Sequence, residues 1–456
     1  MKEKKYISLK ELLEDKKSLS KSALLYSENN LIKSVSYQDL IKNVYKEKEE
    51  FDSLKVNSVV FMLEKKPSLI YQIFGAILSG MRVGIIDPSE PLDKAEEMIK
   101  AFETECLVYD EDEYDEDEKA ELNELVLERE YVKKDKEGSI VFFTSGTSGP
   151  SKGVELEFTS LLCSAWCGQM MLQTTIDDNV ISLLPLSHVF GFVCTLLWPL
   201  AYSSTVSLGR GLRYVLKDPY LFKPTILPLI PNLTMLLITK SGLNKEARII
   251  LVGAGPLPKV FTKMIRDLGL TLALGYGLTE TSSGVAISVN SEDPYFMKPC
   301  PGNEFKLEED GTLSIKSDTL MKGYYNLQEE TKKMIDSQGY FHTSDLAEIN
   351  SKGEIKILGR KDDILVLDNG TKFNALKAES ELSALLPSID LGIYEEEGKI
   401  CLAYFSRVES SDLIVNLKVS EYNAKQPLYA KIQNIKKLSS PLPRTKTGKL
   451  QRYLIK

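Results

Sequence analysis

Short apolar runs alternate with stretches of helical periodicity along most of the chain. The first group comprises three apolar runs separated by two helix-like stretches: Val59–Leu63, Leu69–Leu78, Val83–Ile86, the segment around Met98, and Cys106–Tyr109. This alternation is typical of βαβ units and therefore of a parallel sheet. It returns in four further runs, which predict a second parallel layer: Val180–Leu184, Thr205–Leu208, Thr225–Leu229 and Ile249–Val252.

The pattern changes after Val285. Phe305–Leu307 and Leu313–Ile315 read as strands joined by a hairpin turn, which predicts a small β subdomain. After Gly359 the chain reads as a compact α+β unit, with a helix near Ala375–Leu386 and a hairpin across Glu395–Lys399. We therefore expect an α/β fold with a large body over residues 1–359 and a small C-terminal domain over 360–456.

Charge and composition favour a small-molecule substrate. The chain carries 57 Lys and Arg against 65 Asp and Glu, a net charge of −8, which argues against nucleic acid or an anionic membrane as the main partner. Eight of these acids lie in the run Asp110–Glu118, which we expect to be a solvated loop. With only two histidines, His188 and His342, a histidine-based metal cluster is excluded.

A soluble, cytoplasmic protein is the expectation from the remaining composition. The six cysteines form no Cys-x-x-Cys pair, which is typical of buried thiols in a reducing compartment. No signal-peptide pattern opens the sequence. The apolar segment Leu69–Gly80 is too short to span a bilayer and is soon followed by Arg82, so no transmembrane segment is expected.

One loop has the composition of a phosphate-binding cradle. It runs from Thr144 to Val154, directly after the apolar run Ile140–Phe143, and combines glycines, hydroxyls and Lys152. Glycines let backbone N–H groups turn toward an anion, hydroxyls add donors, and a lysine supplies a point charge. The loop lacks the Gly-Lys-Ser/Thr ending of a Walker A motif. A flexible surface turn is the alternative, but the preceding strand favours a phosphate site.

Two glycine-containing motifs follow apolar strands further on. Gly253–Leu257 and Gly275–Glu280 each contain Gly-x-Gly, but Pro258 and Glu280 stand where a dinucleotide-binding fingerprint needs its third glycine. A lone Gly-x-Gly is typical of a tight turn. The adjacent Thr279 and Glu280 favour function instead, because a carboxylate, a hydroxyl and nucleotide phosphates are ligands that Mg²⁺ accepts.

Together, these motifs resemble those of the adenylate-forming superfamily, most nearly its fatty acyl-CoA and acyl-carrier-protein synthetases. The resemblance covers nearly the whole chain and includes four further motifs in the family order: Gly323–Asn326, Thr343–Leu346, Gly359–Asp363 and Pro443–Lys449. Ser344 departs from the family pattern, which usually has glycine before the aspartate.

The resemblance implies roles for individual residues in binding ATP and Mg²⁺. Tyr276 would stack on adenine, Asp345 and Arg360 would hold the ribose hydroxyls, and Glu280 would hold Mg²⁺ with help from Thr144. The other implied nucleotide-binding residues are Ser145, Gly146, Thr147, Ser148, Gly149, Lys152, Gly253, Ala254, Gly255, Gly277 and Thr279. Lys449 would be catalytic, together with Thr279 and Glu280, by reaching the substrate carboxylate and the α-phosphate. Asp362 would be the hinge of a mobile C-terminal lid.

The resemblance also implies an acid–thiol ligase. His188, Phe190 and Gly191 would border the pocket for the carboxylic acid; His188 alone is equally compatible with a core residue. No aspartate stands there to pair a substrate amine, so an apolar acid is expected, with CoA or the phosphopantetheine of an acyl carrier protein as acceptor. An aryl- or succinylbenzoate-type CoA ligase is the nearest alternative. A non-catalytic nucleotide-binding protein of the same fold is an alternative of another class.

Overall fold

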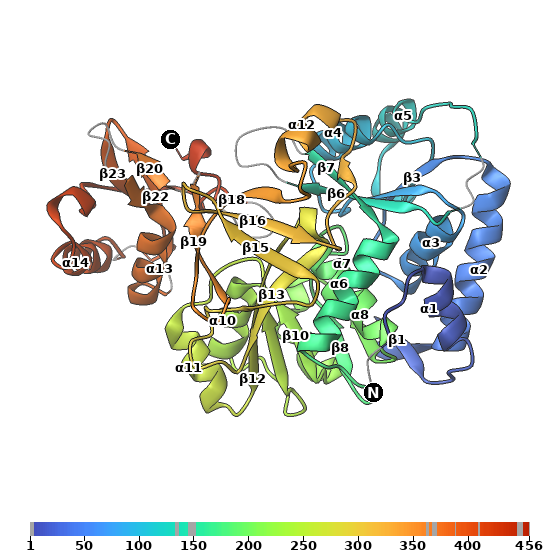
Figure 1. The fold of residues 1–456 in the computed structure, drawn as a ribbon, viewed down its shortest axis with the longest axis horizontal. Helices are drawn as coiled ribbons and strands as arrows, with labels where there is room; N and C mark the ends of the chain where they lie inside the picture. Colours follow the sequence, from blue (N-terminus) through green and yellow to red (C-terminus); the bar gives the residue numbers. More distant parts are fainter. Residues whose placement is uncertain are drawn as a thin grey trace.

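The computed structural model describes residues 4–132, 136–144, 152–361, 364–366, 372–387, 389–408, 411–444 and 450–455. Two large sheets form the body, and a group of smaller elements near the C-terminus lies together at one end of the molecule (Figure 1). The α/β fold predicted from the alternating runs is therefore confirmed. The domain boundary after Gly359 stays a prediction.

The first sheet has six strands in the order β17-β7-β6-β4-β3-β5. Four of them are parallel: β3 (Ser58–Met62), β4 (Arg82–Ile85), β5 (Leu107–Tyr109) and β6 (Ser139–Thr144). They are linked through α3 (Pro67–Leu78) and α4 (Leu92–Phe102), as the sequence pattern predicts. All five residues of β3 are buried, because helices or strands cover both faces of a central parallel strand.

The second sheet has nine strands in the order β14-β13-β12-β11-β10-β8-β9-β1-β2. Its parallel part is β1 (Ser22–Glu28), β8 (Asn179–Ser182), β9 (Thr205–Leu208), β10 (Ile226–Leu229), β11 (Ile249–Val252) and β12 (Thr271–Leu278). Antiparallel strands complete both ends: β2 (Leu31–Ser36), β13 (Ser283–Val289) and β14 (Lys298–Pro299). The N-terminal hairpin β1–β2 thus extends a sheet formed mostly by residues 179–289.

Aromatic and aliphatic side chains join the two sheets around helix α6 (Phe158–Met171). Phe158 packs edge-on against Phe74 of α3, with ring centroids 6.0 Å apart. Phe142 of β6 packs against Phe192 of α7 (Val189–Phe192) at 5.7 Å. One continuous core therefore holds both sheets in fixed relation, and any site between them has rigid walls.

A four-stranded antiparallel sheet follows, in the order β15-β16-β18-β19. Its strands are β15 (Asn303–Leu307), β16 (Thr312–Ser317), β18 (Phe341–Ile349) and β19 (Ile355–Arg360), which confirms the predicted β subdomain and its hairpin. The C-terminal elements are β20 (Ile364–Val366), β21 (Lys372–Asn374), α13 (Ala375–Leu385), β22 (Asp390–Glu396), β23 (Lys399–Phe405), α14 (Ser411–Asn423) and β24 (Asn434–Lys437). Helix α13 and the hairpin β22–β23 stand where the sequence predicts them.

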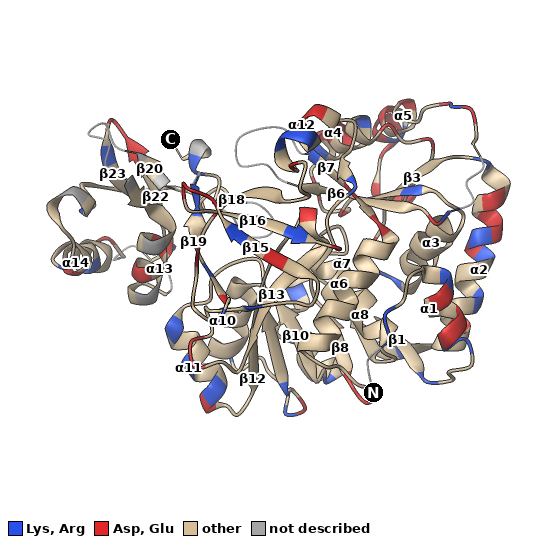
Figure 2. Cartoon of the chain, viewed as in Figure 1, with Lys and Arg blue, Asp and Glu red and all other residues tan. Residues whose placement is uncertain are grey.

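The loop prediction for Asp110–Glu118 is wrong at its end. The last three residues of this acidic run begin helix α5 (Glu116–Glu124), visible as a red helix in Figure 2. Asp115 accepts a hydrogen bond from the Glu118 backbone N–H, and the Glu118 carboxylate accepts one from the Asp115 N–H. This reciprocal capping, together with acidic residues at the positive end of the helix dipole, stabilises a helix that charge repulsion alone would disfavour.

None of the helices in the described part of the chain is both long and apolar enough to cross a bilayer.

Candidate active site

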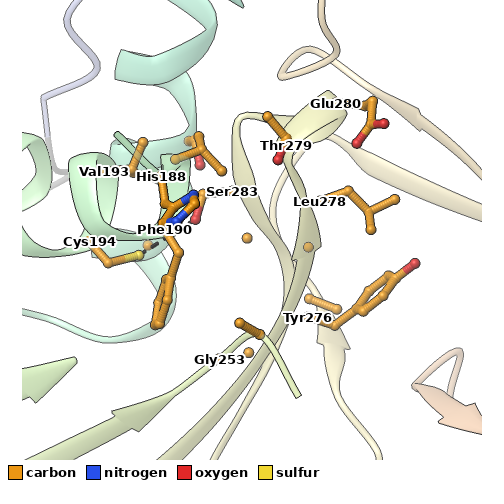
Figure 3. A pocket seen from close by; sticks show the side chains of 18 of the residues that line it. His188, Phe190, Val193, Cys194, Gly253, Tyr276, Leu278, Thr279, Glu280 and Ser283 are labelled. Atoms are coloured by element: carbon orange, nitrogen blue, oxygen red, sulfur yellow. Dashed lines mark hydrogen bonds between the residues drawn. The ribbon is translucent and has the colours of Figure 1, made fainter. Parts of the chain in front are cut away.

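A cavity of about 550 Å³ lies between α6 and α7 on one side and strands β11, β12 and β13 on the other. Figure 3 shows the side chains of His188, Phe190 and Cys194 facing those of β12 and Glu280 across this space. The volume is within the range of sites that bind small molecules. The cavity adjoins the carboxyl ends of parallel strands, where open α/β sheets place their ligands.

The predicted phosphate loop is held at its two ends by strand pairing. Thr144 ends β6, and Lys152 begins the antiparallel strand β7 (Lys152–Glu157); the two residues are direct partners in the ladder. Thr144 Oγ1 donates to the Lys152 carbonyl at 3.3 Å, and both residues line the cavity. The predicted residues Ser145, Gly146, Thr147, Ser148 and Gly149 lie outside the described residues.

Lys152 is the positively charged side chain at this edge of the cavity. Its Nζ lies 3.2 Å from Glu330 Oε2 and 5.2 Å from the ring centroid of Tyr324. The side chain is 42% exposed, so the ion pair with Glu330 is weak and can be exchanged for a bound anion. The position therefore suits a lysine that binds phosphate.

The first glycine motif forms part of the cavity wall through close packing. Gly253 and Ala254 line the cavity, whereas Gly255 lies outside its lining. A Cβ on Gly253 would come within 2.9 Å of the tip of the Phe190 ring, so only glycine lets that ring approach the backbone so closely. Ala254 has a φ of 65°, in the left-handed region. The motif thus forms a tight turn and also packs closely against the Phe190 ring.

The second glycine motif continues along the wall and ends in a carboxylate. Strand β12 contains Tyr276 and Gly277, and a short turn of 3₁₀ helix, Thr279–Thr281, follows it. Glu280 Oε1 accepts a hydrogen bond from the hydroxyl of Tyr324 at 2.9 Å, and the Glu280 carbonyl accepts one from the Met321 N–H. Burial, and then the Glu280 carboxylate, raise the pKa of Tyr324 far above its ordinary value, so its hydroxyl stays protonated as a donor.

A buried carboxylate network lies beside Tyr276. The Tyr276 hydroxyl donates to Asp345 Oδ2 at 2.6 Å, and Arg360 Nε donates to Asp345 Oδ1 at 3.0 Å. Asp345 and Arg360 are direct partners between β18 and β19, which explains why two residues fifteen apart in sequence meet. Burial, and then the Asp345 carboxylate, raise the pKa of Tyr276 well above its ordinary value. Ser344 lies within β18 in extended conformation, so its position does not require a glycine.

The part of the cavity lined by α6, the helix that continues α7, and β13 carries few polar groups, and we call it the inner lobe. His188 and Phe190 line the cavity, as expected for a substrate pocket. Gly191 is not among the lining residues; a Cβ there would lie 2.1 Å from the Pro185 carbonyl oxygen, so packing explains this glycine. The lobe itself is lined by Ser164, Ala165, Gly168, Leu172, Val193, Cys194, Trp198, Ala286, Ile287 and Cys300.

Sequence reasoning did not identify the inner lobe. Its members come from α6, β13 and the helix after α7, and only the fold brings them together. A usable signal was present, because α6 has no charged residue over its 14 positions and has Gly168 near its end. A helix that is uncharged all round is buried, and a glycine inside it indicates close approach of another group.

The inner lobe is electrically neutral. The lysine, glutamate and arginine side chains among the described lining residues are Lys152, Glu280 and Arg360. They come from the start of β7, from the turn after β12 and from β19, and none of them belongs to the inner lobe. Burial raises the pKa of Cys194 to about 12 and that of Cys300 to about 12, so both thiols stay protonated. The cavity thus has a charged part and a neutral part.

The predicted metal site contains suitable ligands. Glu280 supplies a carboxylate and Thr144 a hydroxyl, and both line the charged part of the cavity. Mg²⁺ prefers hard oxygen ligands and usually takes only one or two carboxylates, with phosphate oxygens and water completing its shell. These residues therefore fit a Mg²⁺ ion that arrives with a nucleotide. The predicted catalytic Lys449 and hinge Asp362 lie outside the described residues.

Known proteins with similar sequences are acid–CoA ligases. The chain is 29% identical over 353 residues to a 4-coumarate–CoA ligase of Pinus taeda, a match that covers 68% of this chain and 63% of that enzyme. It is 25% identical over 441 residues to the 2-succinylbenzoate–CoA ligase of Bacillus subtilis (strain 168), with 88% of each chain covered. This chain therefore spans under two thirds of the length of the pine enzyme.

Known structures with the same fold include two enzymes bound to adenylates. The o-succinylbenzoate–CoA synthetase of Bacillus subtilis in complex with AMP superposes with a TM-score of 0.83 at 20% identity, covering 98% of both chains. An anthranilate–CoA ligase in complex with anthranoyl-AMP gives 0.84 at 18% identity, covering 99% of this chain and 96% of that one. These likenesses show the fold.

A family model assigns the chain by sequence. The model described as "AMP-binding enzyme" matches residues 53–325, which is more than half of the chain and includes the phosphate loop, both glycine motifs and Tyr324. The resemblance inferred from the motifs is thereby confirmed. The chain belongs to the AMP-binding enzyme family, within the adenylate-forming superfamily.

Proposed function

We propose that this protein is an ATP-dependent acid–CoA ligase. Its substrates are monocarboxylic acids that are apolar and uncharged apart from the reacting carboxylate. The observation that carries the proposal is the division of one continuous cavity into a part with Lys152, Glu280 and Arg360 and a neutral inner lobe. The charged part suits a nucleoside triphosphate. The inner lobe suits the apolar portion of an acid whose carboxylate reaches the nucleotide. The CoA ligases among its relatives support the same reaction class.

The nucleotide occupies the charged part in this proposal. Lys152 and the phosphate loop bind the phosphates, and Tyr276 and the Gly253–Ala254 turn border the adenine. At the ribose, Asp345 accepts hydrogen bonds from the hydroxyls and Arg360 donates hydrogen bonds to the oxygens. Glu280 and Thr144 would hold Mg²⁺, which when bound offsets the charge of the phosphate oxygens. The Asp345 carboxylate can accept further hydrogen bonds from ribose hydroxyls, because its two oxygens offer more lone pairs than Tyr276 and Arg360 use.

The acid is selected by what the inner lobe lacks. A second carboxylate or an ammonium on the substrate would lie among Ala165, Val193 and Ile287, where no described lining side chain carries an opposite charge. Burying an unpaired charge costs several kcal/mol. Dicarboxylates and amino acids should therefore be poor substrates. Fatty acids and simple aryl acids both satisfy the lobe; the relatives named above act on aryl acids and do not by themselves favour the fatty acids expected from the sequence.

The proposed reaction has two halves. The acid carboxylate attacks the α-phosphorus of ATP and displaces pyrophosphate, giving an acyl-adenylate; a thiol then attacks the acyl carbon and displaces AMP, giving a thioester. Lys449 is proposed to stabilise the charge that gathers between the carboxylate and the α-phosphate. Residues 360–456 are proposed to form a lid that turns at Asp362 between the two halves.

CoA is the proposed thiol acceptor, since the relatives are CoA ligases. The phosphopantetheine of an acyl carrier protein offers the same thiol and is the alternative acceptor. The localisation also stays a proposal: a cytoplasmic enzyme fits the free thiols of all six cysteines.

Pyrophosphate release tests the function. The purified protein, with ATP and Mg²⁺, is offered octanoate, cinnamate, succinylbenzoate, malonate and phenylalanine in turn. We expect release with octanoate or cinnamate and at most traces with the last three acids. Release with none of a broad acid panel, while ATP still binds, would identify a non-catalytic nucleotide-binding protein instead. Repeating the productive reaction with CoA and with a carrier protein identifies the acceptor.

A further inference from the structure

One wall of the cavity is a single helix that leads from His188, which faces Glu280 across the cavity (Figure 3), to Trp198. It begins after His188 and continues without a break through α7, a π-helical turn over Val193–Leu197, and α8 (Trp198–Ala201). The side chains that line the cavity from this helix are Val189, Phe190, Val193, Cys194 and Trp198. At 1.5 Å per residue, Trp198 lies roughly 13 Å further along the axis than Val189.

The indole of Trp198 is fixed in place by a buried glutamine. Trp198 Nε1 donates to Gln169 Oε1 at 2.9 Å. The same amide is held from both ends by Thr174, whose N–H donates to Oε1 at 3.1 Å and whose carbonyl accepts from Nε2 at 2.9 Å. Trp198 is 3% exposed and Gln169 is 2% exposed. These three hydrogen bonds to two residues hold the buried amide in one orientation, and the amide in turn holds the indole.

The neighbouring helix α6 leaves space beside this ring. Gly168 of α6 lines the lobe, and a Cβ built on it would meet a single neighbour within 4 Å, Trp198 Cδ1, at 4.0 Å. A glycine inside a helix has a cost in stability, which suggests that the space itself is of use. The lobe is therefore bounded at the end of this helix by one anchored aromatic ring with a small gap at its edge, which we call its floor.

We propose that Trp198, positioned by Gln169, sets the length of acid that the enzyme accepts. This inference rests on the proposed function. An apolar acid enters with its carboxylate at the charged part and its far end against the indole. Acids that stop short of the ring leave apolar surface unfilled, and longer acids would have to move a ring that its hydrogen bond and burial hold in place. The expected outcome is a sharp upper limit in length.

Two substitutions should move the limit in opposite directions. Trp198→Ala removes the floor, so the acid with the highest kcat/KM should become a longer one, with a gain of about tenfold or more for acids that the wild type rejects. Gly168→Ala adds a methyl group at the gap, so the limit should fall and the longest wild-type substrate should lose about tenfold in kcat/KM. The assay is pyrophosphate release over butanoate, hexanoate, octanoate, decanoate, laurate and palmitate.

The second tryptophan of the chain provides a matched control. Trp166 lies on α6 outside the cavity lining, with Lys5 Nζ 4.9 Å from its ring centroid. Trp166→Ala should leave the order of preference among the six acids unchanged. Gln169→Met keeps the volume and removes the acceptor of the indole N–H; it should broaden the profile toward longer acids, whereas a purely structural glutamine would lower the rate with every acid alike.

A binding measurement separates this inference from the proposed function. Trp166→Phe leaves Trp198 as the single tryptophan, so its fluorescence reports directly on the floor. Acids near the upper limit should change the emission, and acids well below it should not. If the wild type activates acids but Trp198→Ala and Gly168→Ala leave the length profile unmoved, the floor assignment is wrong. If no acid is activated and no acid changes the emission, both the proposed function and the floor assignment are wrong.

Discussion

The hydroxyl of Tyr324 lies 2.9 Å from Oε1 of Glu280 and donates a hydrogen bond to it. The two residues are 44 positions apart, and they meet because β17 (Gly323–Tyr324) pairs with β7 next to the turn that follows β12. Tyr324 thus holds in place the carboxylate proposed to bind Mg²⁺. It is not itself proposed to touch a substrate, so we regard it as a positioning residue.

Replacing Tyr324 by Phe should weaken the enzyme through the metal. Loss of a hydrogen bond to a charged group costs about 1.5–3 kcal/mol, which corresponds to a roughly ten- to hundredfold lower kcat/KM. The Mg²⁺ concentration needed for half-maximal pyrophosphate release should rise in parallel. Tyr325→Phe is the control, because the neighbouring hydroxyl accepts from Arg82 Nη1 instead. Equal effects of both substitutions on the Mg²⁺ requirement would remove Tyr324 from this role.

Glu280→Gln should be far more severe than Tyr324→Phe. The amide keeps the shape of the side chain but has no charge with which to hold Mg²⁺, so adenylation should fall by orders of magnitude while the fold survives. Circular dichroism and the thermal midpoint check the fold, and pyrophosphate release checks the reaction. Wild-type release by this variant would contradict the assignment of Glu280.

Gly253→Ala should impair nucleotide binding through Phe190. The added Cβ would lie 2.9 Å from the Phe190 ring, so the ring must leave its place against the β11 turn. We expect KM for ATP to rise by about tenfold or more, a loss of about 1.4 kcal/mol. Gly255→Ala is the matched control, since its nearest neighbour beyond the adjacent residues, a Pro231 ring carbon, is 3.4 Å away. Comparable KM values for both variants would show that the ring contact is unimportant.

Stability in acid should depend on Asp178. Burial alone would raise the pKa of this carboxyl, but hydrogen bonds from Arg248, Thr225 and the Thr175 N–H outweigh it and lower the pKa to about 2. A carboxyl with a folded-state pKa below its unfolded value stabilises the protein above about pH 4, and this contribution is lost as the pH falls toward 2.

Asp178→Asn should therefore lower the free energy of unfolding by about 2–3 kcal/mol at pH 7. The difference in this free energy between wild type and variant should narrow below about pH 4. Urea denaturation at several pH values measures both quantities. Asp177→Asn, at an exposed neighbouring position, should change little. A destabilisation by Asp178→Asn that stays constant from pH 7 to pH 3 would exclude the ionised carboxylate as its cause.

The proposed lid predicts that two substitutions separate the half-reactions. Lys449→Ala should fail to make acyl-adenylate but should still convert supplied acyl-adenylate into thioester. Asp362→Pro fixes φ near roughly −65° and should hold the lid in one pose, which we expect to be the adenylating one. Single-turnover measurements of each half check this. Equal impairment of both halves by either variant would rule out a lid that alternates between two poses.

Local sequence patterns predicted much of the architecture and the nucleotide motifs. The parallel strands were predictable because runs such as Val59–Leu63 are apolar throughout, and the hairpin at β15–β16 because its turn residues are explicit. The motifs carrying Thr144, Gly253, Tyr276 and Glu280 were predicted to form one site, and the fold brings these four residues to one cavity.

What could not be predicted depends on contacts between distant segments. The pairing of β1 with β9 joins residues 182 positions apart, Leu24 with Val206, and leaves no trace in local periodicity. The inner lobe needs α6, β13 and Trp198 in fixed relation, and the hydrogen bond from Tyr324 to Glu280 needs β17 beside β7. Helix α5 was missed for another reason: a run of like charges indicates a solvated loop, whereas the capping pair Asp115 and Glu118 stabilises a helix there.

The ladder between β6 and β7 has a consequence for how such a site can vary. Thr144 and Lys152 are fixed opposite each other by strand pairing, which uses backbone groups and does not depend on their side chains. The side chain at either position can therefore be exchanged while the ladder keeps its register. Nucleotide affinity and stability can thus change independently of each other, in natural descent or in the laboratory.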